Sequence, residues 1–126
     1  MKKLWTLLLG AAIMLSLTAC GDGGAPKFSE TTDSAKSAVT VVATNWKLDQ
    51  QEYKVKKGEP FTLTLDVQEG VHGIKLEGLS GSLAGKKGSP STKTIIANEA
   101  GSYLITCNVS CGQGHSDMKA RLIVEP

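Results

Sequence analysis

The sequence predicts an all-β fold for the chain after residue 38, either an antiparallel two-sheet sandwich or a Greek-key barrel. Three observations support this. Apolar and polar residues alternate with a period of two, most clearly in residues 61–67 (FTLTLDV). Turns that contain glycine separate most of these segments, and no segment has the apolar spacing of a helix. Short strands within about 88 residues are typical of β-sandwiches and barrels.

The candidate strands follow one another to the end of the chain. The first is rich in Val and Thr, the third alternates without a break, and the last two surround a Gly-rich, Cys-rich loop. Trp46 and Tyr103 fall on these segments, so we expect both in the core. The predicted strands are 39–46, 51–56, 61–67, 72–76, 91–97, 102–107 and 119–125.

Residues 1–19 have the layout of a bacterial secretory signal peptide, with two lysines, an apolar stretch and small residues before Cys20. The apolar run of about 14 residues is shorter than the roughly 20 needed to span a bilayer, although an uncleaved anchor is an alternative. The tetrapeptide LTAC resembles a lipoprotein lipobox, so we expect lipidation at Cys20 and a chain anchored on the extracytoplasmic side of the cell membrane. The alternative is an ordinary cleavage site with an incidental thiol.

Residues 20–38 have one large apolar residue, Phe28, among Gly, Ser, Thr and charged residues, and we expect a flexible tether there. The folded domain is then 39–126. The full chain has fourteen basic and twelve acidic residues, and removal of the two leader lysines leaves it near neutral. This balance offers no footprint for nucleic acid.

Five soft-metal ligands remain after the leader and Cys20 are set aside: His72, Cys107, Cys111, His115 and Met118. Thiolates and thioethers prefer reduced copper, and imidazole binds both copper states, so this mixture indicates a copper site. In the predicted strands, His72 and Cys107 fall on the same faces as apolar residues two and four positions away. The sequence therefore predicts that these ligands gather at one rim of the sheet.

Other interpretations of these ligands stay open at this point. Cys107 and Cys111 are close enough in sequence for a disulfide, and two Cys with two His could bind zinc. A mononuclear blue copper site needs only one Cys, which leaves the second thiol unexplained. No Ser/His/Asp set, HExxH motif or phosphate-binding Gly-rich loop is present. The sequence thus offers no independent sign of catalysis.

The segment from Cys107 to Met118 resembles the CuA domain of cytochrome c oxidase subunit II in its spacing C-x3-C-G-x2-H-x2-M, with His72 as the upstream histidine. The resemblance covers about 39–126. It implies a cupredoxin fold and a binuclear copper centre with Cys107 and Cys111 as bridges. His72 and Met118 would complete one copper, and His115 with the backbone carbonyl of Val109 the other.

The resemblance implies electron transfer from a cytochrome c-type donor to a membrane oxidase, as a component of the respiratory chain that is not catalytic alone. Two departures matter. Val109 replaces the family's usual glutamate, and a leader and tether stand where subunit II normally has a transmembrane hairpin. Docking to an oxidase catalytic subunit is therefore in doubt. The alternative function is a tethered module that stores copper or delivers it to an apo-oxidase.

Overall fold

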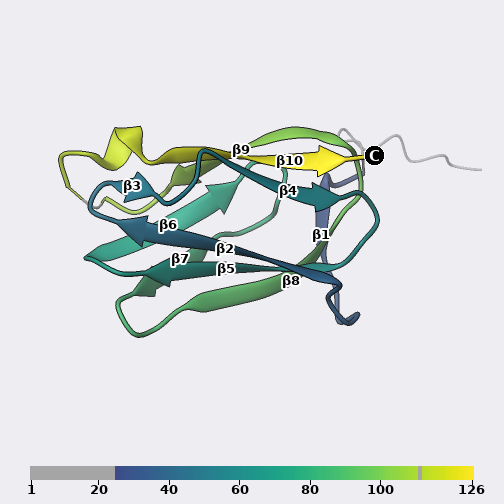
Figure 1. Cartoon of the computed structure of the whole chain (residues 1–126), viewed down its shortest axis with the longest axis horizontal. Coiled ribbons are helices and arrows are strands. Elements are labelled where there is room, and N and C mark those ends of the chain that lie inside the picture. The colour runs from purple at the N-terminus through teal and green to yellow at the C-terminus, as the bar shows by residue number, and fades with distance from the viewer. Residues whose placement is uncertain (1–24, 111) are drawn as a thin grey trace, which may run out of the picture.

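The computed structural model describes residues 25–110 and 112–126. The described residues form ten strands and one short 3-10 helix (Figure 1). Their bounds are β1 Phe28–Glu30, β2 Ser37–Thr44, β3 Lys47–Leu48, β4 Glu52–Lys56, β5 Phe61–Val67, β6 Val71–Leu76, β7 Leu83–Lys86, β8 Ser91–Ala97, β9 Gly101–Cys107, η1 His115–Asp117 and β10 Lys119–Glu125. The predicted all-β class is confirmed.

The strands form two five-stranded sheets that pack face to face. One has the order β1-β8-β5-β2-β3 and the other β4-β10-β9-β6-β7. Most neighbours are antiparallel, but β2 pairs with β5 and β4 pairs with β10 in parallel. The expectation of purely antiparallel sheets was therefore wrong for these two pairs, because each joins strands separated by a crossover between the sheets.

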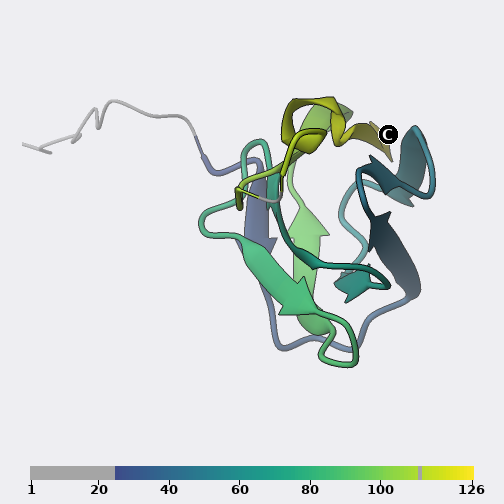
Figure 2. The ribbon, with the colours of Figure 1, turned by 90° about the vertical axis from the view of Figure 1, so that its left-hand side faces the viewer.

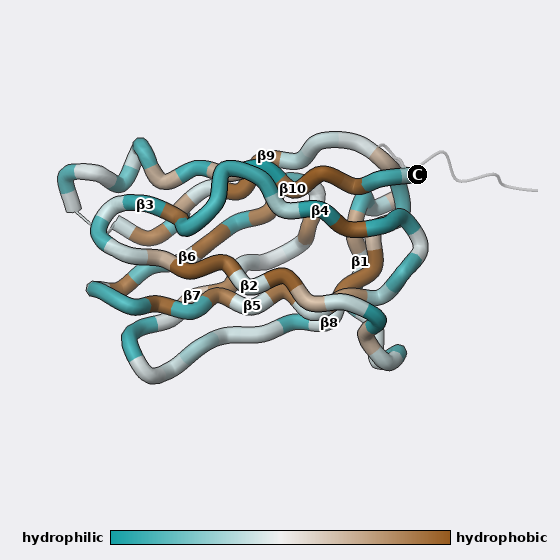
Figure 3. Tube along the Cα trace, in the orientation of Figure 1, coloured by the Kyte–Doolittle hydropathy of each residue, from teal (hydrophilic) through white to brown (hydrophobic). Residues whose placement is uncertain are grey.

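The core lies between the sheets and follows the period-two pattern. On β5, Phe61, Leu63 and Leu65 have no exposed surface, while the threonines between them point outward and are half-buried. Val41 on β2 is equally buried. In Figure 3 the hydrophobic stretches follow the strands, and the hydrophilic stretches lie mostly in the connections. Apolar burial on the facing sides of two sheets is what drives a sandwich to form.

Part of the segment that we expected to be a tether belongs to the fold. Phe28 is 2% exposed and makes an edge-to-face contact with Tyr103, with ring centroids 4.8 Å apart. β1 pairs with β8, and Lys27 forms an ion pair with Glu99. The prediction of a flexible tether over 20–38 is thus wrong for 28–30, because one aromatic side chain supplies enough burial to hold a short edge strand. It is also wrong for 37–38, because β2 begins at Ser37 and pairs with β5 from there.

β3 and β7 were not expected from the sequence. β7 lies in a Gly-rich stretch that resembles a loop, yet Gly85 within it pairs with His72. A methyl group on Gly85 would lie 3.1 Å from the carbonyl oxygen of Ser89 and 3.5 Å from a methyl of Val67. Glycine fits this position because other segments of the same chain pack closely against its backbone, and not because the backbone turns there.

Trp46 is not in the core, contrary to our expectation. It lies in the turn between β2 and β3 and is 41% exposed, whereas Tyr103 is buried as expected. The predicted strand 39–46 extends two residues beyond the end of β2 at Thr44. Tertiary context, not local propensity, therefore decides where this strand stops.

No helix among the described residues is long and apolar enough to cross a membrane. The predicted signal peptide and the predicted lipidation at Cys20 lie outside the described residues. Both stay predictions. In Figure 1, η1 and β3 lie at the left end of the sandwich, and β1 and the C-terminus lie at the right.

Candidate metal centre

Two of the predicted ligands stand in one row across the sheet. Cys107 is the last residue of β9 and pairs with Ile74 of β6. On its other side, the Cys107 N–H donates to the Met118 carbonyl over 3.2 Å, which extends the β9–β10 ladder by one residue. Residues directly opposite each other on neighbouring strands point to the same face. Ile74, Cys107 and Met118 are all buried, so the thiol and the thioether share the inner face.

His72 belongs to the same face, two residues before Ile74 on β6. Its side chain is fully buried, and neither Nδ1 nor Nε2 has a hydrogen-bond partner among the described residues. A buried polar group without a partner costs about 1–3 kcal/mol. An imidazole in such a position calls for a ligand, and a metal ion is the ligand that imidazole nitrogen most often binds in proteins.

The carbonyl of Val109 lies beside the thiol of Cys107. The Cys107 Sγ donates to the Val109 oxygen over 3.2 Å, and the Asn108 N–H donates to the Gly73 carbonyl over 3.0 Å. The second contact joins the residue after Cys107 to the residue after His72. The backbone thus holds the thiol, this carbonyl and the buried imidazole at one end of the sheet.

Gly73 allows this close approach. A methyl group at Gly73 would lie 2.5 Å from the Asn108 Oδ1 and 2.6 Å from a methyl of Val109. A side chain here would force the side chains of Asn108 and Val109 to move, so glycine permits this close packing beside His72. Sequence reasoning missed the role of Gly73; the one available signal was a glycine inside a strand next to a predicted ligand.

η1 presents His115 at the surface of the same end. His115 begins this single turn and is half-buried, and its carbonyl accepts from the Met118 N–H over 3.4 Å. The turn therefore links the half-buried histidine to the buried thioether. Figure 2 looks onto this end and shows the connection from β9 through η1 to β10.

Cys111 lies outside the described residues, so the complete set of ligands is not tested. Within 25–110 and 112–126, no three His, Cys, Asp or Glu side chains gather closely enough to hold a metal ion. The structure instead brings together His72, Cys107, Met118 and the Val109 carbonyl through strand register and hydrogen bonds. Nitrogen, thiolate and thioether donors on one buried face fit copper.

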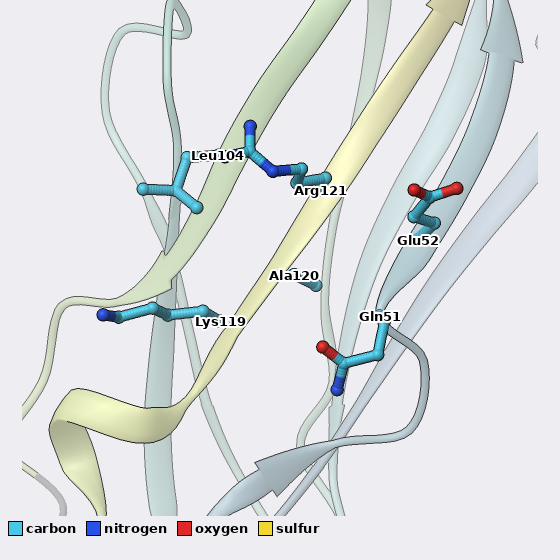
Figure 4. Close-up of a pocket in the computed structure, with 6 residues that line it drawn as sticks. All are labelled: Gln51, Glu52, Leu104, Lys119, Ala120 and Arg121. Carbon is cyan, nitrogen blue, oxygen red and sulfur yellow. The ribbon is translucent and has the colours of Figure 1, made fainter.

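A surface depression elsewhere is unrelated to this centre. It lies on the outer face of the β4-β10-β9 sheet, and Figure 4 shows the side chains around it. None of them is a predicted ligand. They are Gln51, Glu52, Leu104, Lys119, Ala120 and Arg121.

No protein-family model and no curated protein matches the sequence. Solved structures do match the fold. A chain of a heme-copper terminal oxidase dimer is 22% identical with a TM-score of 0.65, over 77% of this chain and 70% of that one. The periplasmic domain of cytochrome oxidase subunit II (CoxB) from Bradyrhizobium japonicum is 15% identical with a TM-score of 0.65, over 75% and 88%.

The protein auracyanin B is also similar, at 17% identity with a TM-score of 0.63, over 81% of this chain and all of that one. At these identities the likeness establishes the fold. The predicted fold class is confirmed: the described part of the chain is a cupredoxin-like β-sandwich.

Proposed function

We propose that this chain is a copper-binding electron-transfer protein with a binuclear CuA-type centre. The observation that carries the proposal is the fully buried imidazole of His72, whose two nitrogens have no partner among the described residues. On the inner face, it is the β6 residue next to Ile74, which stands in one row with Cys107 and Met118. The likeness to an oxidase subunit II domain and to auracyanin B supports a copper site.

Each residue has a role in this proposal. Cys107 and Cys111 would be shared between the two ions, His72 and Met118 would complete one, and His115 and the Val109 carbonyl would complete the other. When bound, two thiolate-bridged copper ions share one unpaired electron, so a change of oxidation state alters each bond little. Strand register fixes the positions of His72, Cys107 and Met118, and their buried inner face excludes water, and both effects would keep reorganisation small.

Lipidation at Cys20 would hold the domain at the extracytoplasmic face of the cell membrane. Since Asn98 donates to the Pro26 and Lys27 carbonyls, only five residues, 21–25, would separate the lipid from the first anchored residue. Five residues span at most about 18 Å when fully extended. β1 lies at the end of the sandwich opposite η1 (Figure 1). The metal end would then be free to meet a cytochrome c-type donor and a respiratory oxidase.

A second candidate function is copper storage or delivery to an apo-oxidase. Val109 favours it, because an apolar side chain stands where the CuA family usually has the glutamate that helps hold a metal between oxidase subunits. A neighbour in fold, a subunit II domain of cytochrome c oxidase that is 12% identical with a TM-score of 0.62, was solved as a mixed disulfide with thioredoxin-like TlpAs. That complex concerns the neighbour's cysteines.

Copper stoichiometry and an electron paramagnetic resonance spectrum test the proposal. The soluble chain from residue 21 keeps every described core residue and is loaded with copper under reducing conditions. Two ions per chain and a seven-line spectrum, from one electron shared by two copper nuclei, are expected. One ion per chain, or a cuprous form that resists oxidation, would favour storage or delivery. Transfer of that cuprous ion to an apo-oxidase domain would then establish delivery.

Variants separate the ligand roles. Cys107→Ser and Cys111→Ser should abolish the seven-line spectrum, whereas Thr106→Ser, on the outward face of the same strand, should keep it. Met118→Leu should retain copper but change the reduction potential, because it removes a thioether that would be a copper ligand. A two-copper centre in both Cys variants would show that the thiolates do not bridge.

A further inference from the structure

The turn between β2 and β3 reaches over the ligand loop. A methyl group on Gly114 would lie 2.2 Å from Cβ and 2.5 Å from Cγ of Trp46, and one on Gly112 would lie 2.9 Å from its Nε1. The indole therefore packs directly on the backbone of both glycines, where only hydrogen atoms fit. These glycines lie in the segment that joins the second predicted bridging cysteine to His115.

The other residue at the tip of this turn reaches the opposite side of the site. A methyl group on Gly70 would lie 2.7 Å from the Asn45 Oδ1 and 3.5 Å from the His72 Nε2. Asn45 and Trp46 are adjacent, so one turn contacts both the chain before His72 and the loop before His115. The turn thus connects the two parts of the chain that supply histidine.

Hydrogen bonds of Asp49 fix the strand ends from which this turn projects. The carboxylate Oδ1 of Asp49 accepts from the Val42 N–H over 2.9 Å and from the Tyr53 hydroxyl over 2.6 Å, and the Asp49 N–H donates to the Val42 carbonyl over 3.0 Å. Tyr53 is itself 5% exposed. Because a core side chain fixes the closing residue of the hairpin, the position of the tip is set by the sandwich and not by the loop it covers.

We propose that Trp46 is a positioning residue of the metal centre: its indole holds the 112–114 segment in place and shields the site from water, which slows the loss of copper. The proposal rests on the copper site proposed above. A tryptophan that is 41% exposed at a turn contributes little to the core, whereas its contact with two glycines of the ligand loop gives it a local task.

Replacement of Trp46 tests the effect on copper. In the chain from residue 21, loaded with cuprous copper, transfer to a cuprous chelator is timed. Trp46→Ala should release copper about 10- to 100-fold faster, the usual effect of removing a group that supports metal ligands. Trp46→Phe keeps a flat ring and should restore most of the retention. Val71→Ala serves as the control, since Val71 is 55% exposed and next to His72.

Fluorescence tests the contact without metal. The sequence has two tryptophans, at 5 and 46, so Trp46 is the only one in the chain from residue 21. In the metal-free protein, Gly114→Ala should displace the indole and shift its emission to longer wavelength, while Gln113→Ala, an exposed neighbour, should not.

Three results would overturn the proposal in distinguishable ways. Unchanged copper release from Trp46→Ala, with normal copper content, refutes the shielding role alone. Unchanged emission from Gly114→Ala refutes the packing contact. Absence of bound copper in every chain, together with the expected emission shift, refutes the proposed function and hence a role toward copper, while the contact itself stands.

Discussion

Replacement of His72 by leucine should stabilise the metal-free protein, although buried-residue substitutions usually destabilise. The neutral imidazole has one N–H donor and one acceptor nitrogen, and neither has a partner among the described residues. Each unpaired group costs about 1–3 kcal/mol. Leucine removes both penalties, but its imperfect packing destabilises the protein by up to roughly 1.5 kcal/mol. The expected net gain in unfolding free energy is about 0.5–6 kcal/mol.

Urea unfolding of the metal-free chain from residue 21 measures this gain. Under reducing conditions, which keep the cysteines as thiols, the unfolding midpoint of His72→Leu should rise by about 0.2 M or more, because urea lowers the unfolding free energy by about 1–3 kcal/mol per M. His115→Leu is the matched control. It removes the other predicted histidine ligand, but His115 is half-buried on η1, so its stability should change by less than about 1 kcal/mol.

Copper should reduce this difference in stability, and reverse it if the metal-free gain is below about 2.7 kcal/mol. Free copper at 100 times its dissociation constant stabilises the wild type by about 2.7 kcal/mol, and His72→Leu should gain much less because it lacks a ligand. A loss of more than about 1 kcal/mol in the metal-free variant would refute the reasoning. It would show that the ring of His72 has a protein partner and that its burial needs no metal.

Three further substitutions test the surrounding structure. Gly73→Ala places a methyl 2.6 Å from Val109 and should lower copper affinity by about tenfold or more in a chelator competition, whereas Val109→Ala, which keeps the carbonyl, should not. Phe28→Ala should lower the unfolding free energy by about 3–5 kcal/mol in urea; no change would mean that β1 is outside the cooperative core. Tyr53→Phe removes the hydrogen bond to Asp49 and should cost about 1.5–3 kcal/mol. Burial, and then the bond to Asp49, raise the pKa of Tyr53 above its usual 10.0, so its stabilising effect is complete below pH 10 and is lost as pH rises through the folded pKa. A pH series should therefore show less alkaline destabilisation in Tyr53→Phe than in the wild type.

The strands predicted from the sequence are those with one wetted and one buried face. β5, β8 and β10 begin and end where the pattern placed them, because alternation alone specifies which side is buried. β1 and β7 were not predicted, because each depends on a contact between residues that are far apart in the sequence or on close packing. β1 depends on Phe28 meeting Tyr103, 75 residues away along the chain, and β7 depends on a close approach at Gly85. Neither contact leaves a local pattern.

The candidate site could be predicted in its ligands but not in its support. Residue types and spacing indicated His72, Cys107 and Met118, and the register of β6, β9 and β10 brings the last two into one row beside the first. The packing of Trp46 on the ligand loop is set by where β2 ends, a boundary that the pattern missed by two residues. Boundaries of this kind are decided by packing and not by propensity.

Departures from ordinary folding rules gather at one end of this sandwich. His72 is a buried polar group without a partner among the described residues, Gly73 is a glycine inside strand β6, and Trp46 lies partly exposed on the backbone of Gly114. Each lowers stability or uses a residue that the local structure does not favour. At the other end, Phe28 packs in the core beside an ordinary ion pair. Proteins keep such departures where function requires them, so their concentration around the ligand loop argues for a metal site independently of the spacing of its cysteines.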